Sequence, residues 1–409
     1  MTHKKTLELA FIKLWVAEII SSLGSSLLSF SLMIWVYKQT NEASSLGYLM
    51  FSYLAPQIYF SLFGGHLVDR FNKKSLLLFS DAFQALCSVV LLALFLSQNL
   101  SLYSVLPVTF INGFFSGIQH LVFLTSMRSF IPKQKLLQYN GMMSVLQSAP
   151  VIVAPLVSLL LLDKIQLSGV IFIDLLTFVL AFLAVLLLPF PKELRKTRGP
   201  LSNKFFNEGF LQIRASKELR ASLSFFTCIN FLNGLAAGLI VAFILEKIGA
   251  DSPWVSYNTS LTALGLTCGG LLTIKISKRI NNPWTPLGWI SLCSAIFGRI
   301  GVVLSTLPFL IGIGFFLRNL MLPLMNSCND TIWQTEVPVE KQGIVFGTRR
   351  LIAQGLYPIG LFLGPLMASK VGLDILFVGV GALEGLASLV LLRATSLPNQ
   401  NVIPATKLG

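Results

Sequence analysis

The chain carries little charge for its length. Only 12% of its 409 residues are Asp, Glu, Lys or Arg, whereas 54% are hydrophobic. A soluble domain uses roughly 25% charged residues to cover its surface with groups that water solvates. The shortage excludes an ordinary soluble protein, and most of the surface is expected to contact lipid.

Residues that bind metals, form disulfides or carry out catalysis are also scarce. The three histidines (His3, His66 and His120) are far apart, and the five cysteines fall in apolar runs without paired spacing. Such cysteines are small apolar fillers rather than disulfides or metal ligands. The sequence contains no phosphate-binding loop and no Ser-His-Asp set. We therefore expect no cofactor, no metal site, no enzymatic activity and no ATP hydrolysis by this chain.

Long apolar runs make up most of the sequence. The stretches 100–127 and 138–162 contain no charged residue, and about 20 helical residues are enough to cross a bilayer. The runs are continuous and do not alternate polar with apolar residues, which indicates helices rather than barrel strands. The prediction is an all-α membrane protein with about twelve spans, at 14–36, 47–67, 76–97, 102–125, 139–162, 169–189, 221–244, 257–277, 285–306, 308–328, 346–368 and 373–394.

The net charge of +14 follows from membrane topology. With the N-terminus in the cytoplasm, 25 of the 31 Lys and Arg residues fall in inner segments and four in outer loops. This asymmetry is the positive-inside rule. It predicts a multi-pass protein of the cell's inner (plasma) membrane with both termini in the cytoplasm. It leaves no basic soluble domain for nucleic acid.

The longest hydrophilic segment divides the chain into two sets of six spans. The predicted domains are a first six-helix bundle (1–189), a cytoplasmic linker (190–220), a second six-helix bundle (221–396) and a cytoplasmic tail (397–409). Phe206, Phe210 and Ile213 in the linker have helical spacing, which predicts an amphipathic helix on the inner membrane face. A solvated linker is the alternative for 192–203. A six-plus-six repeat is typical of transporters whose halves rock about a central site.

One short inner loop concentrates charge between the second and third spans. It reads FGGHLVDRFNKK and includes Gly65, Asp69, Arg70, Lys73 and Lys74. Glycine lets another helix approach closely, and a carboxylate is stabilised near a helix N-terminus. We expect Asp69 to contact the start of the eleventh span, which Arg349 and Arg350 begin, and to form an inner gate between the halves. The alternative is a loop that only anchors the topology.

That loop resembles the signature of the major facilitator superfamily, Gly-x-Leu-Ala-Asp-Arg-x-Gly-Arg-Lys, with Asn72 where a glycine is usual. The rest of the chain resembles the branch of drug:proton antiporters that contains macrolide-efflux proteins and enterobactin exporters. The stretches that carry this resemblance are LWVAEIISSLGSSLLSFSLMIWVYKQT (14–40), LLFSDAFQAL (77–86), IPKQKLLQYNGMMSVLQSAPVIVAPLVS (131–158), IDLLTFVLA (173–181), NEGFLQIRASKELRASL (207–223) and EVPVEKQGIVFG (336–347).

The resemblance implies a fold and a transport pathway, and the chain departs from the pattern of the branch at two positions. Spans one, four, seven and ten would line a central cavity, and Asp81 would pair with Arg70. The branch usually has Gly-Asp in span one, where this chain has Gly24-Ser25, so a candidate proton carrier is missing. Span five normally has glycines around a Gly-Pro, where this chain keeps small residues around Ala154 and Pro155.

Ionisable residues inside predicted spans are expensive and are therefore functional candidates. Glu18, Asp174, Arg318 and Glu384 are the candidates for substrate binding or coupling. Arg318 either faces the pathway or forms a structural pair with Glu384. Glu18 either replaces the missing acid of span one or is a surface acid.

Together these features predict a secondary active transporter that works by alternating access. We expect proton-coupled efflux of a bulky amphipathic compound, such as a macrolide-like drug, a siderophore or a peptide natural product. The expected partners are this small-molecule substrate, protons and the lipid bilayer, and the expected state is a monomer. The alternatives are a lysolipid flippase or importer on the same fold, or a non-transporting membrane sensor.

Overall fold

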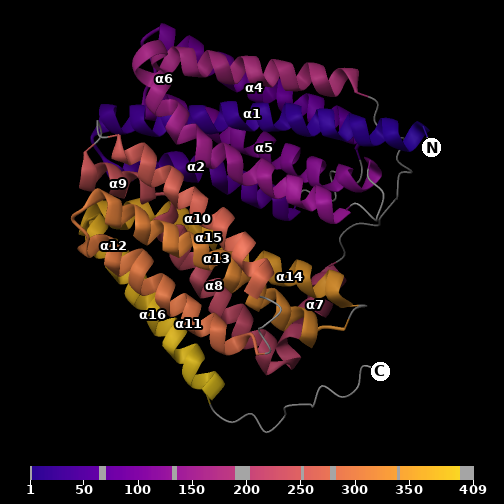
Figure 1. The fold of residues 1–409 in the computed structure, drawn as a ribbon, viewed down its shortest axis with the longest axis vertical. Helices are drawn as coiled ribbons and strands as arrows, with labels where there is room; N and C mark the ends of the chain where they lie inside the picture. Colours follow the sequence, from indigo (N-terminus) through magenta and orange to yellow (C-terminus); the bar gives the residue numbers. More distant parts are fainter. Residues whose placement is uncertain are drawn as a thin grey trace.

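A computed structural model of the chain describes residues 2–63, 71–130, 136–188, 203–249, 253–276, 282–338 and 341–396. These residues form two bundles of helices that lie side by side (Figure 1). The first half contains α1 (Thr2–Thr40), α2 (Ala43–Phe63), α4 (Lys73–Leu96), α5 (Leu102–Phe130) and α6 (Leu136–Leu187).

The second half follows the linker helix α7 (Asn203–Ala215). Its helices are α8 (Lys217–Ala237), α9 (Ile240–Ile248), α10 (Trp254–Ile276), α11 (Trp284–Ala295), α12 (Gly301–Leu304), α13 (Pro308–Glu336), α14 (Gln342–Gly355), α15 (Tyr357–Val371) and α16 (Leu373–Ser396). A single π-helical turn, η3 (Ile296–Ile300), joins α11 to α12.

Each of the twelve predicted spans overlaps described helix, one helix contains two of the spans, and two of the spans are broken. α6 contains a non-helical residue, Gln166 (φ 56°, ψ −177°), so it consists of two helices that correspond to spans five and six. Span seven bends by 43° between α8 and α9. Span eleven is divided at Leu356 into α14 and α15. The breaks in spans seven and eleven place backbone groups and Tyr357 at the middle of spans, where helix packing must satisfy them.

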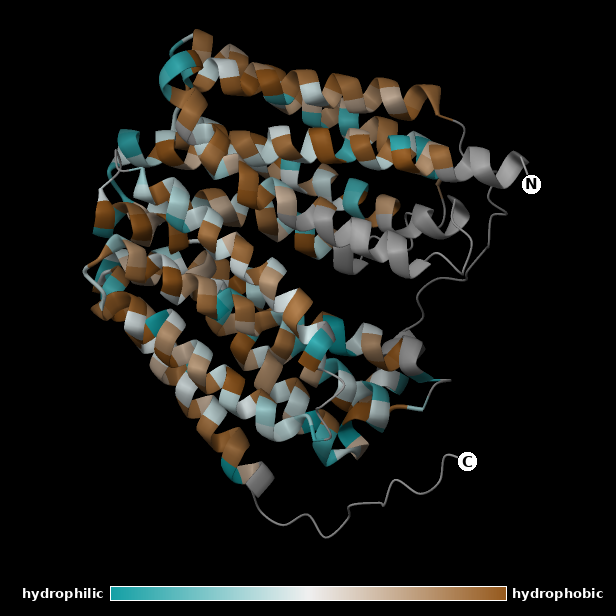
Figure 2. Cartoon of the chain, viewed as in Figure 1, coloured by the Kyte–Doolittle hydropathy of each residue, from teal (hydrophilic) through white to brown (hydrophobic). Residues whose placement is uncertain are grey.

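The outward faces of both halves are apolar, as a lipid contact requires (Figure 2). Large side chains on these faces are strongly exposed, for example Leu187 (81%) and Val390 (67%). Among the described residues, eight helices are long and apolar enough to cross a membrane, or nine if α8 and α9 form one span. The remaining predicted spans are α2, the first part of α6 and α10, which pack in the interior between the halves. The chain is therefore a helical membrane protein.

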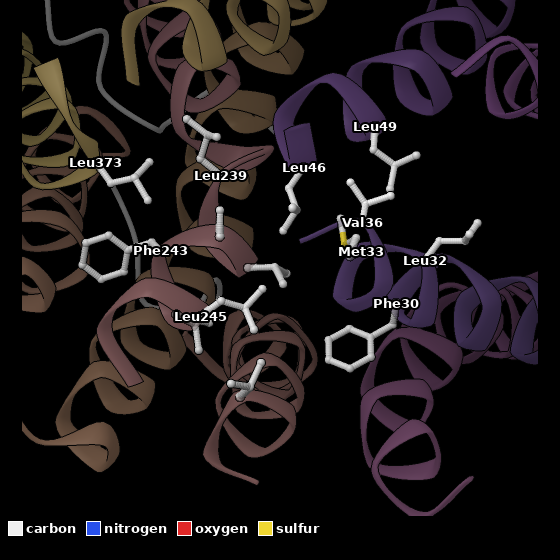
Figure 3. Packing of buried hydrophobic residues seen from close by; sticks show 14 of the residues in the cluster. Phe30, Leu32, Met33, Val36, Leu46, Leu49, Leu239, Phe243, Leu245 and Leu373 are labelled. Atoms are coloured by element: carbon white, nitrogen blue, oxygen red, sulfur yellow. The ribbon is translucent and has the colours of Figure 1, made fainter. Parts of the chain in front are cut away.

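The two halves meet at the end of the molecule opposite the start of α1 (Figures 1 and 3). A continuous apolar cluster there joins Phe30, Val36 and Leu46 of the first half to Leu239 and Phe243 of the second. Close packing extends this contact along α2 and α15 and along α6 and α10. Burial of such a cluster stabilises the contact in proportion to the apolar area removed from its surroundings.

Small residues permit the closest helix contacts. A methyl group on Gly47 of α2 would collide with Pro365 of α15, and one on Gly234 of α8 would collide with the carbonyl oxygen of Tyr357. Helices can approach at this distance only where a side chain is missing, which is the packing mode of membrane helices.

The linker helix α7 lies against α14 rather than standing alone. Gly209 contacts Thr348 and the carbonyl of Ile344, and Ile213 is buried in the core of the second half. The sequence predicted that Phe210 and Ile213 share one apolar face on a membrane. Phe210 is 51% exposed, whereas Ile213 is buried against protein, and the contact of this helix with the membrane stays a prediction. The side chain of Phe206 lies outside the described part.

Candidate functional site

A polar cavity of about 240 Å³ lies inside the first half. Hydroxyl and amide groups dominate its wall, and Glu18 supplies a carboxyl group. The lining residues come from α1, α2, α4, α5 and α6 and are Glu18, Ser21, Ser22, Ser25, Tyr53, Gln57, Gln84, Ser116, Gln119, His120, Phe123, Leu146 and Phe178. No Lys or Arg is among them. The wall can therefore carry a negative charge on Glu18, and a positive charge only if His120 is protonated.

One amide group connects two of the predicted acids. Nε2 of Gln119 donates to Oε2 of Glu18 at 3.2 Å and to Oδ1 of Asp81 at 2.8 Å. Oε1 of Gln119 in turn accepts from Nε2 of Gln84 at 2.6 Å. Asp81 is only 1% exposed. Two carboxyl groups that share one donor in an apolar surrounding are costly to keep charged together, so the arrangement is suited to holding one proton or one cation.

The third acid of the first half lies next to Ser25. Asp174 is fully buried in the second part of α6, where its carboxylate accepts from Ser25 at 3.0 Å and from Ser88 at 2.5 Å. A second cavity of about 50 Å³ borders Asp174, and Ser25 and Tyr53 line both cavities. The acid that the sequence lacks in span one is thus present beside that position, supplied by span six.

The second half contains a buried cluster of charge. Arg318 of α13 is 3% exposed and pairs with Glu384 of α16, which is 1% exposed, at 3.2 Å between Nη1 and Oε2. Nη1 of Arg318 also donates to Ser294 at 2.9 Å, and its Nη2 donates to Oδ1 of Asn233 on α8. Sequence analysis left open whether Arg318 lines the pathway or pairs with Glu384, and the structure pairs them.

Three members of these clusters were not singled out as candidates from the sequence. Arg299 lies in predicted span nine and was not among the candidates, but its Nη2 donates to the same oxygen of Asn233 at 3.2 Å. Gln119 and Asn233 were not singled out, because uncharged amides are common in spans. No Asp, Glu, Lys or Arg lies within one helical turn of either amide in the sequence, so nothing near them marked Gln119 or Asn233.

The predicted inner gate is only partly visible. Gly65, Asp69 and Arg70 lie outside the described residues, so the contacts of Asp69 with α14 and of Arg70 with Asp81 stay predictions. Nζ of Lys74 donates to the carbonyl oxygens of Leu186 and Leu188 at the end of α6, at 2.8 and 3.0 Å.

The partners expected for this gate occupy a different position from the predicted one. α14 begins at Gln342, so Arg349 and Arg350 lie about two turns inside the helix and do not begin it. In this structure Arg349 pairs with Asp330 at 2.8 Å and lies over the Trp333 ring at 5.0 Å.

The small residues of span five pack tightly. Ala154 is 2% exposed and belongs to the apolar cluster that joins the halves, and Pro155 is buried beside it. Three residues on, Ser158 forms a hydrogen bond of 3.1 Å with Ser31 of α1. No group of His, Cys, Asp and Glu that could hold a metal ion occurs within the described ranges.

Comparison with known proteins agrees with this architecture. Macrolide efflux protein A of Streptococcus pyogenes is 25% identical over 394 residues, which are 92% of this chain and 93% of that protein. The uncharacterized MFS-type transporter YfiS of Bacillus subtilis is 24% identical over 417 residues, 96% of this chain and 95% of that protein.

Solved structures show the same fold at low sequence identity. The nucleoside transporter NupG has a TM-score of 0.70 at 13% identity and covers 95% of this chain and 100% of its own. A bacterial homologue of the iron transporter ferroportin, in an inward-facing state, has a TM-score of 0.69 at 14% identity over 95% and 98% of the two chains. The model of the Major Facilitator Superfamily matches residues 14–356, and the chain belongs to this superfamily of membrane transporters.

Proposed function

We propose that the protein is a proton-coupled exporter of a bulky amphipathic compound in the plasma membrane. The relatives named for macrolide efflux support export and suggest a macrolide-like drug as the first compound to test. The superfamily supports transport by alternating access of two halves.

The observation that carries the proposal is the polar cavity of the first half, to whose wall Glu18 contributes a carboxyl group. Glu18 faces this cavity and shares the donor Gln119 with the buried Asp81. Ionisable groups inside spans mark ion pathways and proton relays. A carboxyl pair that is reachable from the cavity in one state and enclosed in the other would exchange a proton for the substrate in each cycle.

The contact between the halves supports a state that is open toward the N-terminal end. The joining cluster lies at the far end, where Ser260 of α10 donates to the carbonyl of Ile152 at 2.7 Å and Phe51 contacts Phe362 with ring centroids 5.3 Å apart. With the N-terminus in the cytoplasm, as the Lys and Arg distribution predicts, this is the inward-open state that takes up a substrate for export.

The proposal is tested in proteoliposomes that contain the purified full-length protein. A pH gradient should drive uptake of a radiolabelled macrolide into vesicles that are acidic inside, and collapse of the gradient should stop it. Glu18→Gln should lower the gradient-driven rate by about tenfold or more, because the cavity loses its titratable wall group. The matched control is Asp163→Asn, which removes an exposed carboxyl group on α6, away from the cavity. This variant should transport at the normal rate. Uptake that is independent of the gradient in the wild type would refute proton coupling.

A further inference from the structure

The charge cluster of the second half contains two cations and one anion. Arg299 and Arg318 both donate to Oδ1 of Asn233, so their guanidinium groups are no more than two hydrogen-bond lengths apart. Glu384 supplies the single carboxylate, and both of its oxygens contact Nη1 of Arg318, at 3.2 and 3.3 Å. Ser294 is neutral, and the cluster therefore keeps one positive charge in excess.

Arg299 bears this excess with most of its donors unused. The residue is 1% exposed, and neither Nε nor Nη1 has a hydrogen-bond partner. It is the only charged side chain in the described part of the protein with such buried, unpartnered nitrogens. Its guanidinium lies 5.4 Å from the ring of Phe377. That ring offers a π face to the charge but no acceptor for an N–H group.

The local backbone is built to hold Arg299 in this place. It stands on η3, and π-helical turns inside α-helices occur frequently at functional sites. Gly381 of α16 leaves room for its Cβ, and Gly298 leaves room for the side chain of Arg318. This close packing prevents Arg299 from turning toward the lipid headgroups, where its N–H groups could find acceptors.

We infer that Arg299, with Arg318, forms a binding site for a monovalent anionic group. Burial of a guanidinium without an acceptor is costly, and a carboxylate or a halide is a strong acceptor to which its N–H groups can donate. The anion is either chloride from water or the carboxylate of a transported compound. Asn233 and Tyr357 are half-buried at the side of the cluster on α8 and α15, and the amide of Asn233 is the group that must yield as the anion enters.

The test measures binding rather than transport, so it is independent of proton coupling. The thermal unfolding midpoint of the full-length protein in detergent is compared in sodium chloride and in sodium gluconate at equal ionic strength. A ligand that binds only the folded state raises the midpoint with the logarithm of its concentration. Chloride should do so for the wild type and for Lys247→Gln, an exposed cation of the same half, but not for Arg299→Gln.

Asn233→Asp keeps the inference falsifiable if Arg299→Gln does not fold. This isosteric change places a carboxylate beside both guanidinium groups, so it should raise the midpoint in gluconate and abolish the chloride effect. A full chloride effect in Asn233→Asp would overturn the site. If the anion is the carboxylate of a transported compound, an amphipathic carboxylic acid should raise the unfolding midpoint of the wild type in place of chloride. The methyl ester of the same acid should not raise it. If neither chloride nor the acid raises the midpoint, the proposed anion site is refuted and Arg299 has a structural role only.

Discussion

Removal of the two partners of the buried ion pair should have unequal effects. Arg318 and Glu384 are 3% and 1% exposed, and breaking such a pair costs about 3–5 kcal/mol. Glu384→Gln leaves two adjacent guanidinium groups without a carboxylate and should reach the upper end, about 5 kcal/mol. Arg318→Met leaves Glu384 beside Arg299, whose Nε and Nη1 are vacant, so we expect about 1–3 kcal/mol.

Thermal unfolding in detergent, in gluconate and at one scan rate, measures this order. One kcal/mol shifts the midpoint of a domain of 150–250 residues by roughly 2–4 °C, so the two variants should differ by several degrees. Arg318→Met with Glu384→Leu should be more stable than Glu384→Gln, because apolar replacement of a whole buried pair is nearly neutral. The control is Lys247→Met, which breaks an exposed pair with Asp374. Equal effects of Arg318→Met and Glu384→Gln would refute the excess of one positive charge in this cluster.

Three further outcomes are expected. Gly113→Ala should destabilise the first half by roughly 1–3 kcal/mol, because the methyl group collides with a backbone carbonyl of α2, whereas Gly379→Ala, with open space around it, should be neutral in the same unfolding assay. In a cysteine-free background, a cysteine at Asn99 should react with impermeant maleimide from outside the cell and one at Thr335 only from inside, and the reverse pattern would invert the topology. Ser260→Ala removes a hydrogen bond between the halves worth about 0.5–1.5 kcal/mol, so spin-label distances across the far end should shift toward longer values, and an unchanged distribution would show that this contact does not hold the end closed.

Most of the spans could be predicted from the sequence because hydropathy specifies them, whereas the arrangement of the two halves came from the family resemblance. A helix that crosses a membrane must satisfy its backbone internally, so apolar length maps directly onto spans. The breaks were harder to predict. Gln166 lies in a positive-φ turn between two apolar runs, and the division at Leu356 lies between Gly355 and Pro358, residue types that a membrane span can also contain without a break. It depends on how α14 and α15 pack against α8 and α2.

The candidate site was predicted as single charges and found as connected groups. Glu18 and Asp81 come from different helices, and nothing in the order of the sequence indicates that Gln119 bridges them. Ser25 stands where the branch usually has an acid. Because α6 packs against α1, the carboxylate of Asp174 nevertheless lies beside this position. Which helices face each other is a property of packing, and a single sequence carries it only through a family resemblance.

The central claim, exchange of protons for an amphipathic compound, is tested most directly by reversing the drive. Proteoliposomes are loaded with a macrolide, diluted into macrolide-free buffer at equal internal and external pH, and followed with a pH-sensitive dye trapped inside. Coupled exchange predicts that macrolide leaving the vesicles drives protons in, so that the lumen acidifies, and that Glu18→Gln abolishes the signal while Asp163→Asn keeps it. Macrolide efflux with no change in internal pH in the wild type would contradict the account.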